Sequence, residues 1–244
     1  MNQKRNSGPV GVITGTGVTE HFEFGEKERI KTEYGVTEVY PGPERSFLLL
    51  PRHGLIHGTP PHRVNYRANI SALYSLGVRK VIASSAVGSM NPKFKVGQLG
   101  VASQFIDFTK RRQDTFFDDT VRHTDMTNPY SLSINAAIGR AAERLGIPVH
   151  QGLVYVCLEG PRFETAAEIR MLRKFGGDVV GMTGIPEVVL AKELGIEYSS
   201  VLVATNWAAG IQPRVSHEEV LEEMKKVGPK VKSLIVATAR DVGD

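Results

Sequence analysis

Short apolar runs alternate with helical patterns along this chain, and several of the runs end directly in a glycine-containing turn. Residues 9–14 (PVGVIT) lead into GTG at 15–17, and residues 46–51 (SFLLLP) lead into RHG at 52–54. Apolar runs of this length are typical of strands buried on both faces, whereas the spacing of residues 65–76 is that of a helix. The alternation predicts an α/β fold in which helices cover both faces of a β-sheet.

The rest of the chain continues this pattern without a linker, a repeat or a low-complexity tract, so residues 1–244 are predicted to form a single domain. A helix is expected at 130–145, stopping at Gly146, and the last helix is expected to open with a capping box formed by Ser216 and Glu219. Gly228-Pro229 is predicted to kink or interrupt that helix. Further strands are expected at 80–84, before a turn of small residues, at 97–103, at 152–158 and within 196–210.

One long stretch, residues 104–128, has no clear periodicity and mixes polar, aromatic and charged side chains. A stretch of this kind is usually functional, and contact with a partner subunit would also account for its aromatic residues. Its basic run, residues 110–112, is followed by Asp114, Asp118 and Asp119, and it is interpreted as a solvated loop.

Charge and cysteine content restrict the partners and the compartment. The net charge of +4 suits an anionic small molecule and is too evenly spread for a nucleic-acid surface. The single cysteine, Cys157, lies in an apolar run and is interpreted as a small buried hydrophobe, so a reducing, cytoplasmic location is expected. The N-terminal residues lack the apolar stretch of a signal peptide, and no apolar run approaches the ~20 residues of a membrane span.

Residues 159–187 (EGPRFETAAEIRMLRKFGGDVVGMTGIPE) combine three local features in one short segment. A turn places Phe163 beside Glu164, a helix follows, and a strand then ends in Met182-Thr183. Because ligands of open α/β sheets bind at the carboxyl ends of strands, this segment is predicted to build two walls of a site. One wall is flat and aromatic with a carboxylate acceptor, and the other is small and carries a hydroxyl.

Four strand ends carry groups that can bind a small anion. Glycine turns expose backbone N–H groups, hydroxyls add donors, and an arginine can bind phosphate through two hydrogen bonds. For each residue alone, the alternative is a surface ion pair or an ordinary strand-end hydrogen bond. The GTG turn is neither a Walker A loop nor a dinucleotide-binding motif. The groups are Thr16, Arg52-His53, Ser84-Ser85 and Thr183.

Three histidines in HGLIHGTPPH (His53, His57 and His62) raise the question of a metal site. No aspartate, glutamate or cysteine lies near them in the sequence to complete one, so no metal is expected. A histidine that assists Arg52 in anion binding is the preferred interpretation.

Seven motifs together resemble the trimeric purine nucleoside phosphorylase and methylthioadenosine phosphorylase family. In the family's order they are ITGTG, PRHG, VNYRANI, SSAVGS, EGPRFET, GMTGIPEVVLAKELGI and ATN, and they span nearly the whole chain. The resemblance implies a single α/β domain with a mixed sheet, assembled as homotrimers or dimers of trimers. It also implies a glycosyltransferase of purine salvage that uses phosphate as co-substrate to release a free base and ribose 1-phosphate. No metal or organic cofactor, nucleic acid or membrane would be involved.

The same resemblance implies roles for individual residues. The phosphate ligands would be Thr16, Arg52, His53, Ser85 and Thr183, and the residues acting in catalysis would be Asn206, His53 and His217. The substrate-binding positions would be Ala86 and Met182 under the ribose, Phe163 on the purine ring, Glu164, Asn206 and Ala208 around the base, and His217, Val220 and a neighbouring subunit's His123 at the 5′ end.

Two positions favour a 6-oxopurine base. Adenine-specific members of the family carry Asp-x-Asp where this chain has Asn206-Trp207-Ala208. A leaving adenine presents two donors along that edge, whereas hypoxanthine or guanine presents a donor at N7 and an acceptor at O6, which an asparagine amide matches. Glu164 can accept N1–H of a 6-oxopurine, where adenine-specific members carry a small hydroxyl residue. The alternative for Glu164 is a surface carboxylate stabilised by a helix N-terminus.

The 5′ end of the nucleoside gives mixed indications. His217 matches the position at which nucleoside phosphorylases of this family use a histidine toward the 5′-hydroxyl, whereas methylthio-specific members have an apolar residue there. Val220 suits either substituent, and PRHG and VNYRANI resemble the methylthio branch more closely. The predicted activity is phosphorolysis of inosine and guanosine. The alternatives are phosphorolysis of 5′-methylthioinosine or 5′-methylthioadenosine, nucleoside hydrolysis, and non-catalytic purine binding.

Overall fold

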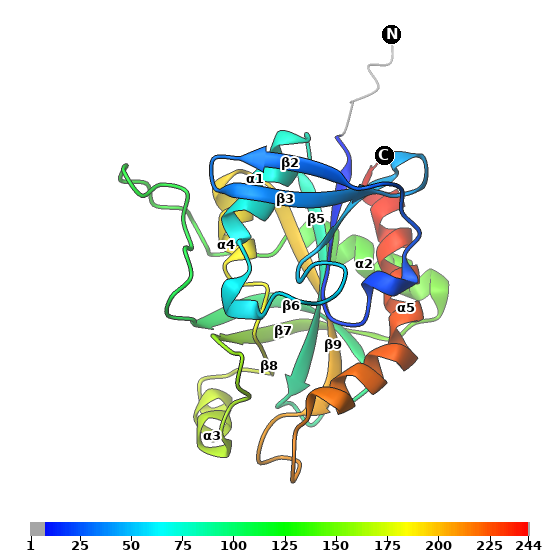
Figure 1. The fold of residues 1–244 in the computed structure, drawn as a ribbon. Helices are drawn as coiled ribbons and strands as arrows, with labels where there is room; N and C mark the ends of the chain where they lie inside the picture. Colours follow the sequence, from blue (N-terminus) through cyan, green and yellow to red (C-terminus); the bar gives the residue numbers. More distant parts are fainter. Residues whose placement is uncertain (1–7, 244) are drawn as a thin grey trace.

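One mixed β-sheet of nine strands forms the centre of the computed structural model, which describes residues 8–243 (Figure 1). The strands are β1 (Val10–Thr14), β2 (Glu28–Thr32), β3 (Gly35–Pro41), β4 (Phe47–Pro51), β5 (Lys80–Ser89), β6 (Leu99–Phe108), β7 (Val149–Leu158), β8 (Val179–Gly181) and β9 (Glu197–Trp207). β4, β1, β5 and β9 run parallel to one another. β2 and β3 form an antiparallel hairpin, which the sequence analysis does not predict, and β3 extends the sheet beyond β4.

Half of this sheet closes on itself. β5 pairs with β9 along its whole length and with β8 at its end, while β6 connects β9 to β7 and β7 pairs with β8. The result is a ring of five strands within the mixed sheet that the family resemblance implies. β5 also continues to Ser89 through the small residues 86–88, where the sequence predicts a turn, because their backbone pairs with β9 across a bulge at Val87 and Gly88.

Helices cover both faces of the sheet, as the alternating pattern predicts (Figure 1). α1 (Tyr66–Ser75) and α4 (Glu187–Glu193) pack together on one face, and α2 (Leu132–Leu145) and α5 (His217–Gly243) pack together on the other. α3 (Ala166–Lys174) packs its buried Ile169 and Leu172 against β7 and β8. Short 3-10 turns at Thr19–His21, Pro43–Arg45 and Pro61–Arg63 complete the elements of the described chain.

The helix ends follow local sequence signals. Ser131 caps α2 by accepting a hydrogen bond from the backbone N–H of Ile134, so the helix begins two residues later than predicted. The same helix ends at Gly146, which adopts φ 64°, as the predicted stop signal requires. At the start of α5, Ser216 Oγ accepts from Glu219 N at 3.2 Å, which is the first half of the predicted capping box.

α5 runs through Gly228-Pro229 as one helix, so the interruption named in the prediction of a kink or an interruption does not occur. The helix buries a continuous face that includes Met224, Val231 and Leu234, and this packing against α2 and β9 outweighs the hydrogen bond lost at the proline. Gly228 is required by close approach, since a Cβ there would lie 2.3 Å from His21 Nε2.

Residues 109–131 form a long irregular excursion from the sheet, drawn in green in Figure 1. The predicted aperiodic stretch falls mainly in it, although residues 104–108 belong to β6. Among the contacts that anchor it, Glu193 accepts from Thr115 Oγ1 at 2.7 Å, and Arg67 Nη1 lies 2.6 Å from Asp118 Oδ2. Among the described residues, no helix is both long and apolar enough to cross a bilayer.

Candidate active site

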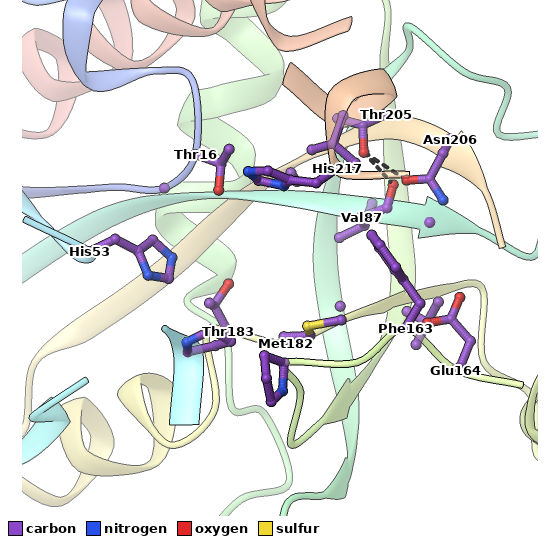
Figure 2. A pocket seen from close by; sticks show the side chains of 18 of the residues that line it. Thr16, His53, Val87, Phe163, Glu164, Met182, Thr183, Thr205, Asn206 and His217 are labelled. Atoms are coloured by element: carbon purple, nitrogen blue, oxygen red, sulfur yellow. Dashed lines mark hydrogen bonds between the residues drawn. The ribbon is translucent and has the colours of Figure 1, made fainter. Parts of the chain in front are cut away.

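A cavity of about 280 Å³ lies where the ends of several strands converge (Figure 2). The turns after β1 and β4, the second half of β5, the segments after β7 and β8, the end of β9 and the first turn of α5 all contribute to its lining. The motifs singled out in the sequence thus come together at one place. The residues that line it are Gly15, Thr16, His53, His57, Pro61, Ala86, Val87, Gly88, Pro161, Phe163, Glu164, Val180, Gly181, Met182, Thr183, Thr205, Asn206, His217 and Val220.

One end of the cavity gathers hydroxyl and glycine donors. Thr16 and Thr183 line it, and Ser85 Oγ lies 3.4 Å from Thr183 Oγ1 directly behind. The backbone N–H of Gly15 donates to Ser84 Oγ at 3.1 Å. A Cβ at Gly15 would lie 3.0 Å from both the carbonyl oxygen of Ser84 and Arg52 Nη1, so only glycine fits this turn without displacement.

Arg52 lies behind the cavity rather than in its lining, with a side chain that is fully buried. Its Nε and Nη2 donate to the two carboxylate oxygens of Glu187, the Nη2 bond at 2.9 Å, and its Nη1 donates to Ser84 O at 2.9 Å. Tyr198 donates its hydroxyl to the same carboxylate at 2.7 Å. Burial alone would lower the pKa of Arg52, but the charge and hydrogen bonds of Glu187 raise it, so the guanidinium stays charged.

Glu187 is a site-associated residue that sequence reasoning missed. Its carboxylate is fully buried and pairs with Arg52 although the two residues are 135 positions apart. A signal was present in the sequence, because an acidic side chain opens the otherwise apolar run EVVLA and buried carboxylates are almost always paired.

His53 is held as a neutral imidazole. Its Nδ1 lies 2.8 Å from the carbonyl oxygen of Thr59, which can only accept, so Nδ1 carries the hydrogen and Nε2 is left as an acceptor. Burial, and then the positive charge of Arg52, lower the pKa of His53 to about 4. At neutral pH this residue therefore offers a lone pair rather than a positive charge.

His57 lies beside Thr16, His53 and His217 and is a second residue absent from the sequence-based site. Its Nε2 lies 3.2 Å from Thr16 Oγ1, and its ring stacks on His217 with centroids 6.1 Å apart and an interplanar angle of 16°. Its ring also lies 4.5 Å from that of His53. A φ of 53° at this non-glycine residue is strained backbone of the kind that persists when surrounding contacts fix it.

The opposite end presents an amide and a carboxylate. Asn206 Oδ1 lies 2.9 Å from Thr205 Oγ1, and Asn206 Nδ2 donates to Trp207 O at 2.9 Å. Glu164 is buried and accepts from the backbone N–H of Ala209 at 3.3 Å. In Figure 2 the ring of Phe163 lies between Asn206 and Met182.

The remaining predicted positions divide between the cavity and its surroundings. Ala86, Met182 and Val220 line it, whereas Ala208 is buried behind it. His123 is exposed on the excursion and does not reach the cavity of its own chain. Within residues 8–243, no group of three or more histidine, cysteine, aspartate or glutamate side chains is arranged to hold a metal ion.

Cys157 and Arg112 lie just beneath these strand ends. Cys157 is fully buried, as predicted, and burial raises the pKa of its thiol to about 12. The prediction that residues 110–112 form a solvated loop is wrong for Arg112, whose side chain is only 2 % exposed. Its guanidinium donates to the backbone carbonyl groups of four residues at the ends of β7 and β8. These are Leu158, Glu159, Met182 and Ile185.

The fold is that of nucleoside phosphorylases. A solved structure of a mutant adenosine/methylthioadenosine phosphorylase from Schistosoma mansoni, in complex with methylthioadenosine, superimposes with a TM-score of 0.90 at 30% identity, over 96% of this chain and 91% of that one. A family model described as the phosphorylase superfamily matches residues 9–240, so the chain belongs to that superfamily.

Two curated relatives are more similar in sequence. A protein of Moorella thermoacetica named "Probable 6-oxopurine nucleoside phosphorylase" is 48% identical over 93% of this chain and 90% of its own length. A protein of Methanopyrus kandleri named "Probable S-methyl-5'-thioinosine phosphorylase" is 47% identical over the same shares of the two chains.

Proposed function

We propose that this chain is a 6-oxopurine nucleoside phosphorylase, which uses inorganic phosphate to convert inosine and guanosine into free base and ribose 1-phosphate. The observation that carries the proposal is that Asn206 and Glu164 both line one end of a cavity whose other end gathers the donors around Thr16. The names of both curated relatives agree on the class of base, since the hypoxanthine of thioinosine is a 6-oxopurine.

The base end of the cavity suits a 6-oxopurine. Asn206 Oδ1 can accept N7–H of the leaving base while the second hydrogen of its Nδ2 donates to O6. Glu164 accepts one hydrogen bond, from the backbone N–H of Ala209, and its remaining carboxylate lone pairs can accept N1–H of the base. Phe163 and Met182 supply the apolar surfaces on either side of the purine and ribose.

The phosphate end suits the attacking nucleophile. Thr16, Thr183 and, behind it, Ser85 supply hydroxyl donors, and the buried guanidinium of Arg52 supplies positive charge from behind the lining. A phosphate oxygen forms the new bond to C1′ as the C1′–N9 bond breaks, and the electron pair passes to the purine, which takes up the proton that hydrogen phosphate loses. The phosphate charge stabilises the positive charge that develops on the sugar.

The residues expected at the 5′ end of the nucleoside also fit one alternative activity, which is phosphorolysis of 5′-methylthioinosine. His217 is exposed and can offer a hydrogen bond to a 5′-hydroxyl, whereas Val220, one turn later, is buried and apolar. The Methanopyrus kandleri relative is named for the methylthio substrate at nearly the same identity as the Moorella thermoacetica protein.

The test is a side-by-side assay on inosine, guanosine, adenosine and the 5′-methylthio forms of inosine and adenosine, each with and without phosphate. We expect phosphate-dependent release of hypoxanthine and guanine, with kcat/KM for adenosine lower by about 10- to 100-fold or more, because the wrong base leaves a buried polar group unpaired. Cleavage without phosphate would instead indicate a hydrolase. Binding of hypoxanthine without turnover would indicate a non-catalytic protein.

The assembly and setting of the enzyme are part of the same proposal. We infer a homotrimer, in which His123 of each exposed excursion reaches the 5′ end of a neighbouring site. Residues 1–244 would act as one phosphorylase domain in the cytoplasm, with phosphate as co-substrate and without a metal or organic cofactor.

A further inference from the structure

The guanidinium of Arg112 contacts both segments that form the opposite walls of the cavity. It belongs to the irregular excursion, yet its side chain is buried beneath the ends of β7 and β8. It is absent from the residues that line the cavity, so any effect on ligands passes through the residues it holds.

The first wall is held through the end of β7. Arg112 Nη2 donates to Glu159 O at 2.9 Å and to Leu158 O at 3.3 Å, and Nε lies 3.4 Å from Glu159 Oε1. These two residues directly precede the turn that carries Phe163 and Glu164. The carboxylate of Glu159 also accepts from the backbone N–H groups of residues 110 and 111, so the contact is fixed from both sides.

The second wall is held through the turn after β8. Arg112 Nη2 donates to Met182 O at 2.8 Å, and Nη1 donates to Ile185 O. These carbonyl groups flank Thr183 and Gly184, beyond the last paired residue of β8. Since a buried carbonyl group without a partner is costly, this turn depends on the guanidinium for its conformation.

A further contact explains why arginine is needed. Nη1 also donates to Tyr66 Oη at 3.2 Å, and the guanidinium lies 5.3 Å from the centroid of that ring. A planar group with five N–H donors can serve acceptors from three directions at once, whereas a lysine ammonium is a compact point charge with three donors.

We propose that Arg112 is a positioning residue that fixes the distance between the Phe163–Glu164 wall and the Met182–Thr183 wall. This inference rests on the proposed function, because those walls are assigned to the base and to the phosphate. Loss of the guanidinium loosens both walls together, so binding of nucleoside and binding of phosphate weaken in parallel.

The variants are Arg112→Lys and Arg112→Met, with Arg111→Met as the matched control because the neighbouring Arg111 is exposed. KM for inosine, KM for phosphate and kcat are measured well below the melting temperature of each variant. We expect both KM values to rise by about 10-fold or more in each Arg112 variant, which corresponds to about 1.4 kcal/mol or more. The control is expected to stay within about twofold of wild type.

Two readouts separate positioning from general stability. In Arg112→Ala, added methylguanidinium is expected to lower both KM values again, because it can refill the vacated site, while it leaves Arg111→Met unchanged. Hydrogen exchange of backbone amides is expected to accelerate together in residues 160–165 and 183–187 of Arg112→Met, with exchange in α5 unchanged.

The outcomes distinguish this inference from the proposed function. A lower melting temperature with unchanged KM values and unchanged exchange in the two segments would leave Arg112 with a purely structural role. Equal changes in the Arg111 variant would also overturn the inference. If wild type cleaves none of the nucleosides, the proposed function fails, and the exchange comparison still decides whether Arg112 holds the two walls.

Discussion

At the scale of single residues, the site depends on the orientation of one amide. The Asn206 side chain is held between Thr205 Oγ1 and Trp207 O, and the carbonyl oxygen of Trp207, which can only accept, selects the Nδ2 end of the amide (Figure 2). With Oδ1 beside the Thr205 hydroxyl and Nδ2 on a carbonyl, the acceptor and the donor face the base in a fixed order. The side chain can therefore distinguish a leaving 6-oxopurine, which presents a donor and an acceptor, from a leaving adenine, which presents two donors.

Replacement of Asn206 by aspartate tests this order. In Asn206→Asp the carboxylate can accept but not donate, so we expect kcat/KM for inosine to fall by about 10- to 100-fold and the relative use of adenosine to rise. The measurement is kcat/KM for both nucleosides at saturating phosphate. Unchanged inosine kinetics would remove Asn206 from the mechanism.

His53 predicts a pH dependence of stability. Because its pKa falls from about 6.5 in the unfolded chain to about 4 in the folded protein, the unfolded state binds more protons between these values. Stability from this residue is therefore present above pH 6.5 and lost as the pH falls toward 4, by up to about 3 kcal/mol.

The measurement is the free energy of unfolding in urea across that pH range for wild type and His53→Asn. Asparagine keeps a donor for Thr59 O but does not titrate, so the variant is expected to lose less stability on acidification. Parallel curves for the two proteins would contradict the assignment of a neutral His53.

At the scale of elements, α5 links the core to the cavity. Its first turn supplies His217 and Val220, while its middle packs so closely on the turn after β1 that Gly228 has no room for a side chain. The position of the histidine therefore depends on a contact far along the helix. The obstructing atoms are those of His21 and the carbonyl oxygen of Gly17.

Two glycine-to-alanine substitutions in helices are expected to change the stability of the protein in opposite directions. Gly228→Ala places a Cβ 2.3 Å from His21 Nε2, and we expect a loss of about 1–3 kcal/mol despite the better helix propensity of alanine. Gly139→Ala in α2 meets nothing closer than Gln151 Nε2 at 3.5 Å, so a gain of about 0.5–1 kcal/mol is expected. Chemical denaturation measures both, and a stabilised Gly228→Ala protein would contradict the packing described.

At the scale of the whole molecule, local motifs were predictable and long-range pairings were not. The strand ends at Thr16, His53 and Thr183 follow from turn residues next to apolar runs, and the structure brings them to one cavity. Closure of the sheet depends on pairing between β5 and β9, more than a hundred residues apart, which no local pattern encodes.

Buried charge was the other feature that local patterns concealed. Arg112 lies in a run of basic residues that looks solvated, and Glu187 looks like an ordinary acidic residue at a helix start. Only the fold shows that the first meets unpaired carbonyl groups and the second meets Arg52. Ligand-binding residues are therefore easier to predict from the sequence than the residues that position them.

The proposed trimer is testable at this scale. Light scattering coupled to size exclusion is expected to give three times the 26.7 kDa chain mass, or six times for a dimer of trimers. In such an assembly His123→Ala is expected to raise KM for inosine several-fold, by about 1 kcal/mol, while leaving KM for phosphate unchanged. A monomeric, fully active enzyme would exclude a contribution from the neighbouring subunit.

The closed half of the sheet has a consequence for how ligands enter and leave. β5 belongs both to the parallel layer and to the five-strand ring, and its residues 86–88 line the cavity at the junction of the two. A junction braced from both sides cannot hinge open, so the bottom of the cavity keeps its shape during turnover. We expect gating to involve the exposed lining residues, such as His57 and His217, whose rings stack on each other, and product release should respond to changes there rather than to changes in the sheet.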